Sequence, residues 1–336
     1  MIKEEYDLII IGAGFCGLII GQSLTQSSFN FKIFEKSKAF GGRASTRRIG
    51  GQSVDHGLQY FTPQNREFAT WMQAYLEQGL IKLWANQFYE WKSNNKKLSL
   101  EEKSNSYYAC PNGMTSLMKE IAKVLPVSRE IKIMSAERDF EENIWTLETD
   151  QQIEIKTKKI ICTAPLEQSL NLFKNYLSSA EELALSKIEY NSALIGIFAF
   201  EFDEMPCPDW KGIICSEHEI LNWIAQDSSK RDKPNQLILV AQCNPEFSQK
   251  NFNESEEILL AQIEKALKSI LPNFNYKLKE KQLKKWLYAE PISGLNKPFM
   301  SAIEDSLILC GDWCLASRLE GSFLSGKAVS EHLLNI

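Results

Sequence analysis

The chain has 336 residues, of which 44% are hydrophobic and 24% charged, and its formal net charge is -5 at pH 7. This composition is ordinary for a soluble globular protein with a well-buried core in one large or two closely associated domains. The small acidic excess gives no reason to expect nucleic acid or an anionic membrane as a partner. No apolar stretch approaches the length of a membrane span, and the N-terminal residues lack the basic region of a signal peptide.

The cysteines give no sign of a disulfide scaffold. Several lie inside apolar runs, where a reduced cysteine acts as a small hydrophobe, and a chain of this length does not depend on disulfides for its core. We therefore expect a reducing, cytoplasmic environment. Histidine and cysteine spacing suggests no metal site. The cysteines are Cys16, Cys110, Cys162, Cys207, Cys215, Cys243, Cys310 and Cys314.

The first clearly patterned segment is an apolar run over residues 8–11 that leads directly into Gly-Ala-Gly-Phe-Cys-Gly at residues 12–17. A strand, a Gly-x-Gly-x-x-Gly turn and a helix, in this order, form a dinucleotide-binding motif. Gly12 permits the tight turn, Gly14 leaves room for a pyrophosphate, and Gly17 lets the helix pack closely on the sheet. The start of the helix then directs unpaired N–H groups at the phosphates.

A second strand, predicted over residues 29–34, ends in Glu35. A carboxylate at this distance beyond Gly12 can accept hydrogen bonds from the hydroxyls of an adenosine ribose. The alternative is an ordinary solvated charge at the end of a strand. Because strand, glycines, helix and acid occur in the required order, we predict a dinucleotide-binding βαβ unit.

A glycine pair, Gly41 and Gly42, precedes Arg43. Such a loop can approach a ligand closely and deliver one fixed cation, which we expect near the pyrophosphate. Farther along, residues 55–62 contain an acid and a glycine that interrupt a β-run just before an aromatic pair.

The segment from Thr62 to Pro111 is rich in aromatic residues, and we assign it to a domain that covers the substrate. Within it we predict a helix over residues 65–76, a strand over 84–91 and a polar hairpin or loop over 92–105. A further helix is expected from Pro111 to about residue 125.

The chain then alternates strands. We predict a strand over residues 129–133, a small antiparallel meander over 145–149 and 153–157, and a buried strand over 159–162 that ends in a small-residue turn.

A second excursion begins with a capping box, Ser178 to Glu181, that starts a helix ending near residue 187. Strands of an antiparallel sheet are predicted over residues 193–200, 212–215, 221–225 and 237–242. An amphipathic helix over 254–271 has on its predicted core face Ile258, Leu259, Ile263, Leu267 and Ile270.

The glycine motif, Glu35, Gly41-Gly42-Arg43 and residues 55–62 together resemble the FAD-binding half of flavin amine oxidases. The Ser-Thr-Arg-Arg and Gln-Tyr-Phe-Thr sequences at 45–48 and 59–62 are most similar to renalase and its bacterial relatives. The C-terminal region agrees, because Cys-Gly-Asp-Trp at 310–313 closes an apolar strand and residues 318–326 open the last helix.

The resemblance implies an α/β fold. A Rossmann-type FAD-binding domain, similar to those of flavin amine oxidases and p-hydroxybenzoate hydroxylase, would be formed by residues 1–61, 112–165 and 290–336. An α+β substrate domain with an antiparallel sheet would be formed by 62–111 and 166–289.

It also implies non-covalently bound FAD. Asp312 would bond the ribityl chain, and the helix starting near Gly321 would stabilise the reduced flavin through its dipole. Without the resemblance, Gly311 and Asp312 would be a strand-ending turn with an acidic cap. The full predicted cofactor set is Gly12, Ala13, Gly14, Phe15, Cys16, Gly17, Glu35, Lys36, Gly42, Arg43, Asp55, His56, Gly57, Leu58, Gln59, Ile131, Gly311, Asp312, Glu320, Gly321, Ser322 and Phe323.

Candidates for the substrate-facing, catalytic positions come from two separate crossings between the predicted domains, where a ligand pocket is expected. They are Tyr60, Phe61, Thr62, Trp286 and Tyr288. Trp286 and Tyr288 share one strand face because of their i, i+2 spacing. Each could instead be a core aromatic residue.

The remaining polar residues suggest little acid–base chemistry. The three histidines are His56, beside a predicted flavin contact, His218, in a predicted surface turn, and His332, predicted to be solvated on the last helix. No Ser-His-Asp or Cys-His arrangement is evident. Cys310 and Cys314 could suggest a redox pair, but we favour a structural role for both. Cations available for an anionic substrate are Arg47, Arg48 and Arg318.

Resemblance to renalase implies an oxidase that takes hydride from 2- or 6-dihydro isomers of NAD(P)H, releases NAD(P), and passes electrons to O2 to give hydrogen peroxide. A dihydropyridine becomes aromatic when it loses hydride, so no catalytic base is required. The alternative enzyme is an oxidase of small primary or secondary amines. A third, non-enzymatic possibility is a flavoprotein whose substrate domain serves a partner.

Overall fold

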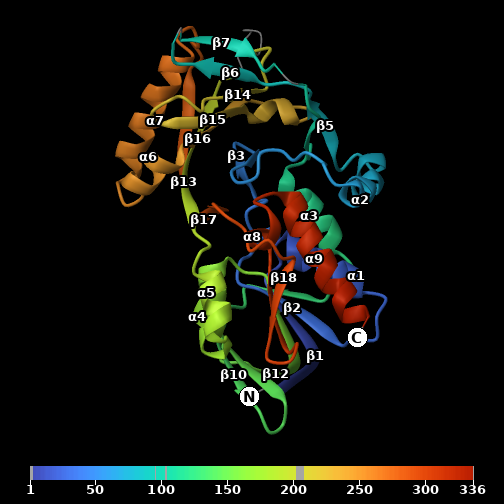
Figure 1. Cartoon of the computed structure of the whole chain (residues 1–336). Coiled ribbons are helices and arrows are strands. Elements are labelled where there is room, and N and C mark those ends of the chain that lie inside the picture. Colours follow the sequence, from blue (N-terminus) through green and yellow to red (C-terminus); the bar gives the residue numbers. More distant parts are fainter. Residues whose placement is uncertain (1–2, 95, 103, 202–207, 336) are drawn as a thin grey trace. The chain divides into compact units, whose positions relative to one another are not determined.

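The computed structural model describes residues 3–94, 96–102, 104–201 and 208–335 (Figure 1). Cys207 lies outside these ranges. The chain divides into two compact units. The first comprises Met1–Ala44, Leu117–Glu189 and Pro291–Ile336, and the second comprises Ser45–Ser116 and Tyr190–Glu290. Residues 45–61, 112–116 and 290, predicted in the FAD-binding domain, belong to the second unit, whereas residues 166–189, predicted in the substrate domain, belong to the first.

The first unit is built on an eight-stranded sheet. Its central strands β1, β2 and β12 are parallel, and apolar residues 8–11 of β1 pair with 159–162 of β12. The second half of β12 also pairs with β19, while its first half pairs with β11. The strands are β1 (Lys3–Ile11), β2 (Phe31–Glu35), β9 (Val127–Arg129), β10 (Ile133–Asp139), β11 (Ile144–Thr149), β12 (Glu154–Cys162), β18 (Phe299–Ala302) and β19 (Leu307–Cys310).

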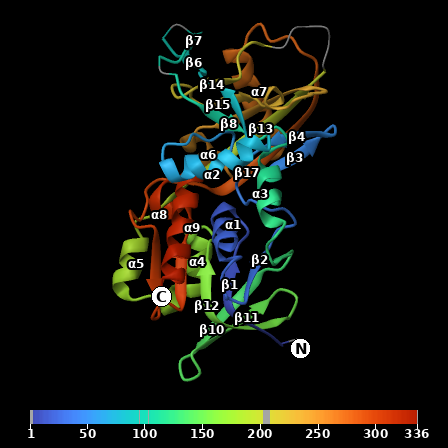
Figure 2. The same ribbon diagram turned by 90° about the vertical axis from the view of Figure 1, so that its right-hand side faces the viewer.

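Helices α1 (Phe15–Leu24) and α9 (Leu319–Leu334) lie side by side in this unit, as both ribbon views show (Figures 1 and 2). They come from opposite ends of the chain, so the two termini contribute to one layer. The predicted capping box is confirmed at the start of α5 (Ser179–Leu185), where Ser178 and Glu181 cap each other. The other helical segments are α4 (Leu166–Phe173), a 3-10 turn (Lys174–Tyr176) and α8 (Asp312–Leu315).

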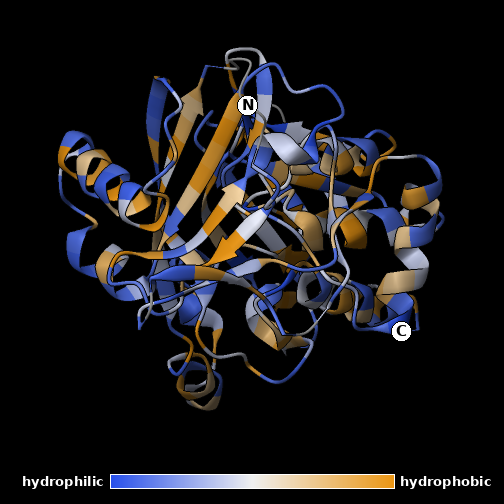
Figure 3. Ribbon diagram, turned by 90° about the horizontal axis from the view of Figure 1, so that it is seen from above, coloured by the Kyte–Doolittle hydropathy of each residue, from blue (hydrophilic) through white to orange (hydrophobic). Residues whose placement is uncertain are grey.

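The second unit contains a seven-stranded, largely antiparallel sheet in the order β17-β13-β16-β15-β14-β6-β7. Its apolar face packs against α7 (Glu256–Ile270), and the hydropathy colouring marks strands rich in apolar residues (Figure 3). The strands are β6 (Tyr89–Lys92), β7 (Lys97–Leu100), β13 (Tyr190–Phe200), β14 (Gly212–Ile214), β15 (Leu221–Gln226), β16 (Leu237–Cys243) and β17 (Leu278–Pro291).

Smaller elements complete the second unit. Two hairpin-like pairs join β3 (Thr46–Ile49) to β4 (Gln52–Asp55) and β5 (Lys82–Ala85) to β8 (Tyr107–Ala109). The predicted helix after Asn65 is confirmed as α2 (Arg66–Glu77), with the Asn65 side chain capping two backbone N–H groups. The remaining helical segments are α6 (Pro245–Asn251), a 3-10 turn (Asp227–Lys230) and α3 (Met114–Ala122), which passes from the second unit to the first.

Two predicted strands differ from the structure. The strand expected over 129–133 is instead β9, ending at Arg129, because Glu130 has a φ of +59° and turns the chain before β10 begins. The strand expected over 84–91 is interrupted between β5 and β6, which belong to different sheets.

Two predictions of exposure are also wrong. Ile258 was expected in the core, but it lies at the edge of the apolar stripe of α7 and is 48% exposed. His218 was expected in a surface turn, but it is buried, because its Nδ1 accepts hydrogen bonds from the backbone N–H groups of Ile220 and Leu221. Its Nε2 lies 3.2 Å from the hydroxyl of Ser269.

Candidate functional site

The glycine turn after β1 has the geometry that its sequence predicts. Gly12 has a φ of +105°, which an L side chain rarely adopts, and its N–H donates to the carbonyl of Phe34 at the end of β2. A Cβ at Gly17 would lie 2.1 Å from the carbonyl oxygen of Gly12. The backbone conformation at position 12 and the close backbone contact at position 17 therefore require glycine, whether or not a ligand is bound.

Gly14 is different, because the protein itself leaves space beside it. Its φ of -68° suits any residue, and a Cβ built there meets no atom within 4 Å. It caps α1 without any side-chain hydrogen bond, and the first turn of α1 carries no acid. Gly14 pairs with Gly41 in an isolated β-bridge, and a Cβ at Gly42 would lie 3.7 Å from the Cα of Gly14. The two glycine loops thus lie together at a helix N-terminus, an arrangement that suits a phosphate.

Glu35 lies beside the same turn. Its carboxylate accepts hydrogen bonds from the N–H of Ala13 at 2.8 Å and from the N–H of Ser37 at 2.7 Å. The N–H of Ile131, a predicted cofactor contact, donates to the Glu35 carbonyl. The structure therefore brings Glu35, Ala13 and Ile131 together. Lys36 points elsewhere, since its ammonium donates to the side chain of Gln168.

Arg43 and Asp312 form the connection between the N-terminal motif and the C-terminal region. Arg43 Nη2 lies 2.7 Å from Asp312 Oδ1, and the two side chains are 28% and 11% exposed. Gly311, with a φ of +147°, ends β19 and donates its N–H to the hydroxyl of Ser325 in α9. Two residues predicted separately as cofactor contacts therefore meet within the first unit.

The start of α9 follows directly. Arg318 occupies the N-cap position without a side-chain cap, and Glu320 lies in the first turn. A Cβ at Gly321 would lie 2.1 Å from the carbonyl of Ala316, so the close turn into the helix requires glycine there. The N–H of Ser322 donates to the Arg318 carbonyl, and Phe323 is buried.

The predicted residues Phe15 and Cys16 are buried in α1. Cys16 Sγ lies 3.8 Å from Cys310 Sγ. Burial raises the pKa of the Cys310 and Cys314 thiols well above the ordinary value. Such protonated, enclosed thiols are poor nucleophiles, which supports the structural role predicted for Cys310 and Cys314.

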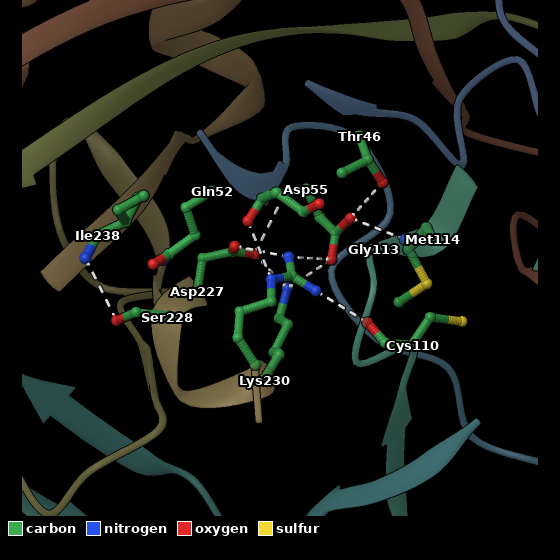
Figure 4. A network of polar contacts seen from close by, with 12 residues as sticks. Thr46, Gln52, Asp55, Cys110, Gly113, Met114, Asp227, Ser228, Lys230 and Ile238 are labelled. Carbon is green, nitrogen blue, oxygen red and sulfur yellow. Dashed lines mark hydrogen bonds and ion pairs between the residues drawn. The ribbon is translucent and has the colours of Figure 1, made fainter. Parts of the chain in front are cut away.

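In the second unit, Asp55 lies in a buried network of charges (Figure 4). Its carboxylate accepts from the guanidinium of Arg231 at 2.8 Å, from the hydroxyl of Thr46 at 2.6 Å and from the N–H of Met114 at 2.9 Å. Lys230 lies 3.5 Å away. Burial alone would raise the pKa of Asp55, but Lys230 and Arg231 hold it below the ordinary value.

A second acid completes this network. Asp227 pairs with Lys230 at 2.8 Å and with Arg231 at 2.7 Å, so two acids and two bases neutralise one another. Protein groups donate to both carboxylate oxygens of Asp55. Through these hydrogen bonds its side chain holds the backbone N–H of Met114 and the side chains of Thr46 and Arg231 in place. Asp227, Lys230 and Arg231 were not among the predicted site residues, although they have the i, i+3 and i, i+4 spacing of neighbouring charges.

The residues just after Asp55 are held by side-chain amides. Gln59 donates to the carbonyls of Asp55 and Gly57 and accepts from Lys230. Gly57 also accepts a hydrogen bond from Gln242 of β16. Leu58 is half-buried.

His56 and Trp286 form a stacked pair. Their ring centroids are 5.7 Å apart at an interplanar angle of 14°, and Trp286 Nε1 donates to the His56 carbonyl at 2.9 Å. The ammonium of Lys284 lies 5.1 Å from the centroid of the Trp286 ring. Burial, with Lys284 and Arg47 nearby, lowers the pKa of His56 to about 4. His56 is therefore neutral near neutral pH.

The other predicted catalytic residues lie among aromatic neighbours of the second unit. Tyr60 contacts the rings of Phe88 and Tyr107 at 5.2 and 5.0 Å, and Phe61 is buried against Phe68 and Tyr108. Tyr288 contacts Tyr190 in a T-shaped pair, and Thr62 is half-buried. A role in contact with substrate stays a prediction for these four residues and for Trp286.

The described residues offer neither a membrane-spanning helix nor a metal site. None of the described helices has the length and apolar character needed to cross a membrane. In the same residues, no group of three or more histidines, cysteines or acids could hold a metal ion.

Comparison with known proteins supports a nucleotide-binding domain that includes the glycine turn, and the matched segment runs from the first unit into the second. A family model for an NAD(P)-binding Rossmann-like domain matches residues 10–76. A Mycobacterium tuberculosis protein named flavin-containing monoamine oxidase AofH is 35% identical over 57 residues. That match covers 17% of this chain and only 13% of the relative.

Solved structures match over the whole chain. Putrescine oxidase bound to putrescine gives a TM-score of 0.80 at 12% identity and covers 100% of both chains. A protein named protoporphyrinogen oxidase from Exiguobacterium sp. 255-15 gives 0.78 at 12% identity and covers 99% of each chain. At this identity the likeness establishes the fold, and it confirms the predicted flavin-oxidase type of α/β architecture.

Proposed function

We propose that the chain is an FAD-dependent oxidoreductase. The observation that carries this proposal is the meeting of Arg43 and Asp312 in the unit that holds the glycine turn. An NAD-type βαβ motif needs no such contribution from the far end of the chain, whereas an extended dinucleotide has both a pyrophosphate and a ribityl chain to be held. The fold shared with flavin oxidases supports the same choice.

The residues present fit that cofactor. Gly14 and Gly42 leave the space that a pyrophosphate needs, and the uncapped start of α1 supplies N–H donors. Each carboxylate oxygen of Glu35 accepts one backbone N–H and keeps a second acceptor position, which a ribose hydroxyl can use. Arg43 supplies one cation for the phosphates. Bound flavin would supply the hydride-accepting chemistry.

For the substrate, we propose a dihydronicotinamide dinucleotide, oxidised to NAD(P) with O2 as the electron acceptor. The donor ring gains aromaticity when it loses hydride, so the protein has to position the donor and exclude water rather than remove a proton. The one histidine beside the Trp286 ring supports this, because its lowered pKa and its stacking leave it a weak base.

A small amine is the second candidate. The specific observation in its favour is the likeness over the whole chain to putrescine oxidase, whose structure contains putrescine. An amine must lose its proton before oxidation, and such an enzyme normally offers a neutral, aromatic-lined site.

The two candidates separate in one experiment. FAD-loaded protein is mixed anaerobically with 2- or 6-dihydro-NAD(P) in a stopped-flow instrument, and in parallel with putrescine or another small amine. Loss of the visible flavin absorbance with the dinucleotide alone supports the proposed substrate. Bleaching by the amine alone would establish the second candidate, and no bleaching by either would exclude both.

A further inference from the structure

Two opposite faces of the β3–β4 hairpin are used differently. Along this hairpin Thr46 is paired with Asp55, and the next pair, Arg47 with Val54, points to the opposite face. Since side chains directly opposite in an antiparallel pair share a face, Thr46 and Asp55 point to the buried charge network. Arg47 lies on the other face, together with His56, which continues the hairpin by donating its N–H to the carbonyl of Ser45.

A comparable division occurs on β17. Lys285 faces one side, where its ammonium donates to the carbonyls of Phe252 and Glu254. Lys284 and Trp286 share the other side, and Trp286 is fixed to His56 by its hydrogen bond and by ring stacking. Lys284 lies over the indole ring. The second unit thus presents one half-buried aromatic stack with Lys284 and Arg47 next to it.

The charge at this stack is not compensated in the described part of the chain. Neither Lys284 nor Arg47 forms an ion pair with any described residue, in contrast to Lys230 and Arg231. The acid that acts on His56 is Asp55, and Lys230 and Arg231 balance its charge. Lys284 and Arg47 both lower the pKa of His56, so the positive potential of these two side chains extends to its ring. Such a positive, partly desolvated site attracts anions and repels ammonium groups.

We propose that Lys284 and Arg47, beside the His56–Trp286 stack, form a binding site for a phosphate-bearing group of the substrate. The inference rests on the proposed function and assigns two further residues to it. The two cations contact the diphosphate of a dihydronicotinamide dinucleotide, and the stack holds Lys284 in place over the Trp286 ring. A protonated diamine is disfavoured at the same place. Lys284 and Arg47 are specificity residues and take no part in hydride transfer.

The test uses FAD-loaded protein and titration calorimetry with NAD+ as the probe, so that no turnover is needed. Lys284→Ala and Arg47→Ala should each weaken NAD+ binding about tenfold or more and reduce its dependence on salt, because each removes one charged hydrogen bond. Lys284→Arg should restore most of the affinity. Lys279→Ala is the matched control, since Lys279 is an exposed lysine on the same strand, and it should bind like the unaltered protein.

Several results would overturn the inference. These are unchanged affinity and salt dependence in both alanine variants, loss of FAD instead of NAD+ affinity, or no binding of NAD+ by the unaltered protein. Failure of the proposed function would look different. If NAD+ binds and the Lys284→Ala variant loses it, yet dihydronicotinamides never bleach the flavin, the binding site stands and the proposed reaction falls.

Discussion

Arg43 Nη2 lies 2.7 Å from Asp312 Oδ1, although 269 residues separate the two in the chain. The pair joins the loop after β2 to the end of β19, beside the glycine turn of the first unit. As a partly exposed ion pair it contributes about 1 kcal/mol or less to stability. The proposed function gives the pair another role, in which the two side chains hold the cofactor together.

Arg43→Ala should therefore impair cofactor binding far more than folding. We expect the FAD content of the purified protein to fall and its FAD affinity to weaken about tenfold or more, since one charged hydrogen bond to phosphate is lost. The measurement is absorbance-monitored reconstitution of the apoprotein. Lys158→Ala, which removes an exposed ion pair with Asp7 in the same unit, is the control and should retain FAD. Equal FAD affinity in both variants would remove Arg43 from the site.

The glycines of the turn should separate ligand effects from folding effects. Gly14→Ala places a methyl group in space that the protein leaves open, so we expect a loss of about 1 kcal/mol or less in stability and a large loss of FAD binding. Gly17→Ala forces a Cβ against the Gly12 carbonyl and should destabilise the apoprotein itself. Thermal unfolding and FAD titration of both variants check this contrast. A strongly destabilised Gly14→Ala apoprotein would contradict it.

The buried network around Asp55 should be essential for the stability of the second unit. Replacement of one partner leaves an uncompensated buried charge, so Asp55→Asn or Arg231→Met should cost about 3–5 kcal/mol. Asp232→Asn breaks an exposed pair with Lys82 and should change stability by about 0.5 kcal/mol or less. Urea unfolding provides all three values. Similar costs for Asp55→Asn and Asp232→Asn would show that the network is unimportant.

Stability should also depend on pH through His56. Its folded-state pKa of about 4 lies below the ordinary value of 6.5, so between these values the unfolded chain binds a proton and the folded chain does not. Stability therefore falls as the pH decreases, by about 2 kcal/mol near pH 5. His218, whose pKa burial also lowers, acts in the same direction. The free energy of unfolding, measured between pH 4 and 6.5, should depend less on pH in the His56→Gln variant than in the unaltered protein. An unchanged pH dependence would show that His56 is not the group responsible.

Features that depend on a short stretch of the chain could be predicted from the sequence. Gly12, Gly14 and Glu35 belong to a short motif whose spacing fixes their geometry, and the structure brings them together as predicted. Asp312 was expected at the cofactor because of a resemblance, and this role stays a prediction. The structure shows its contact with Arg43, another predicted cofactor residue.

Other features depend on distant partners and were not predictable. The network of Asp55 needs Arg231, 176 residues away, and no local pattern indicates which acid a buried base will meet. The ring of His218 is buried and accepts hydrogen bonds from two backbone N–H groups of its own turn. The hydrophilic residues around His218 in the sequence had suggested an exposed turn instead. The end of β9 depends on a positive φ at Glu130, a conformation that the residue type does not predict.

Reconstitution of the apoprotein with FAD decides whether the first unit is a flavin site. We expect one FAD to bind per chain, to give the visible absorbance bands of oxidised flavin, and to be released on acid denaturation without remaining attached to the polypeptide. A folded, colourless protein that takes up no FAD on reconstitution would show that the chain is not a flavoprotein.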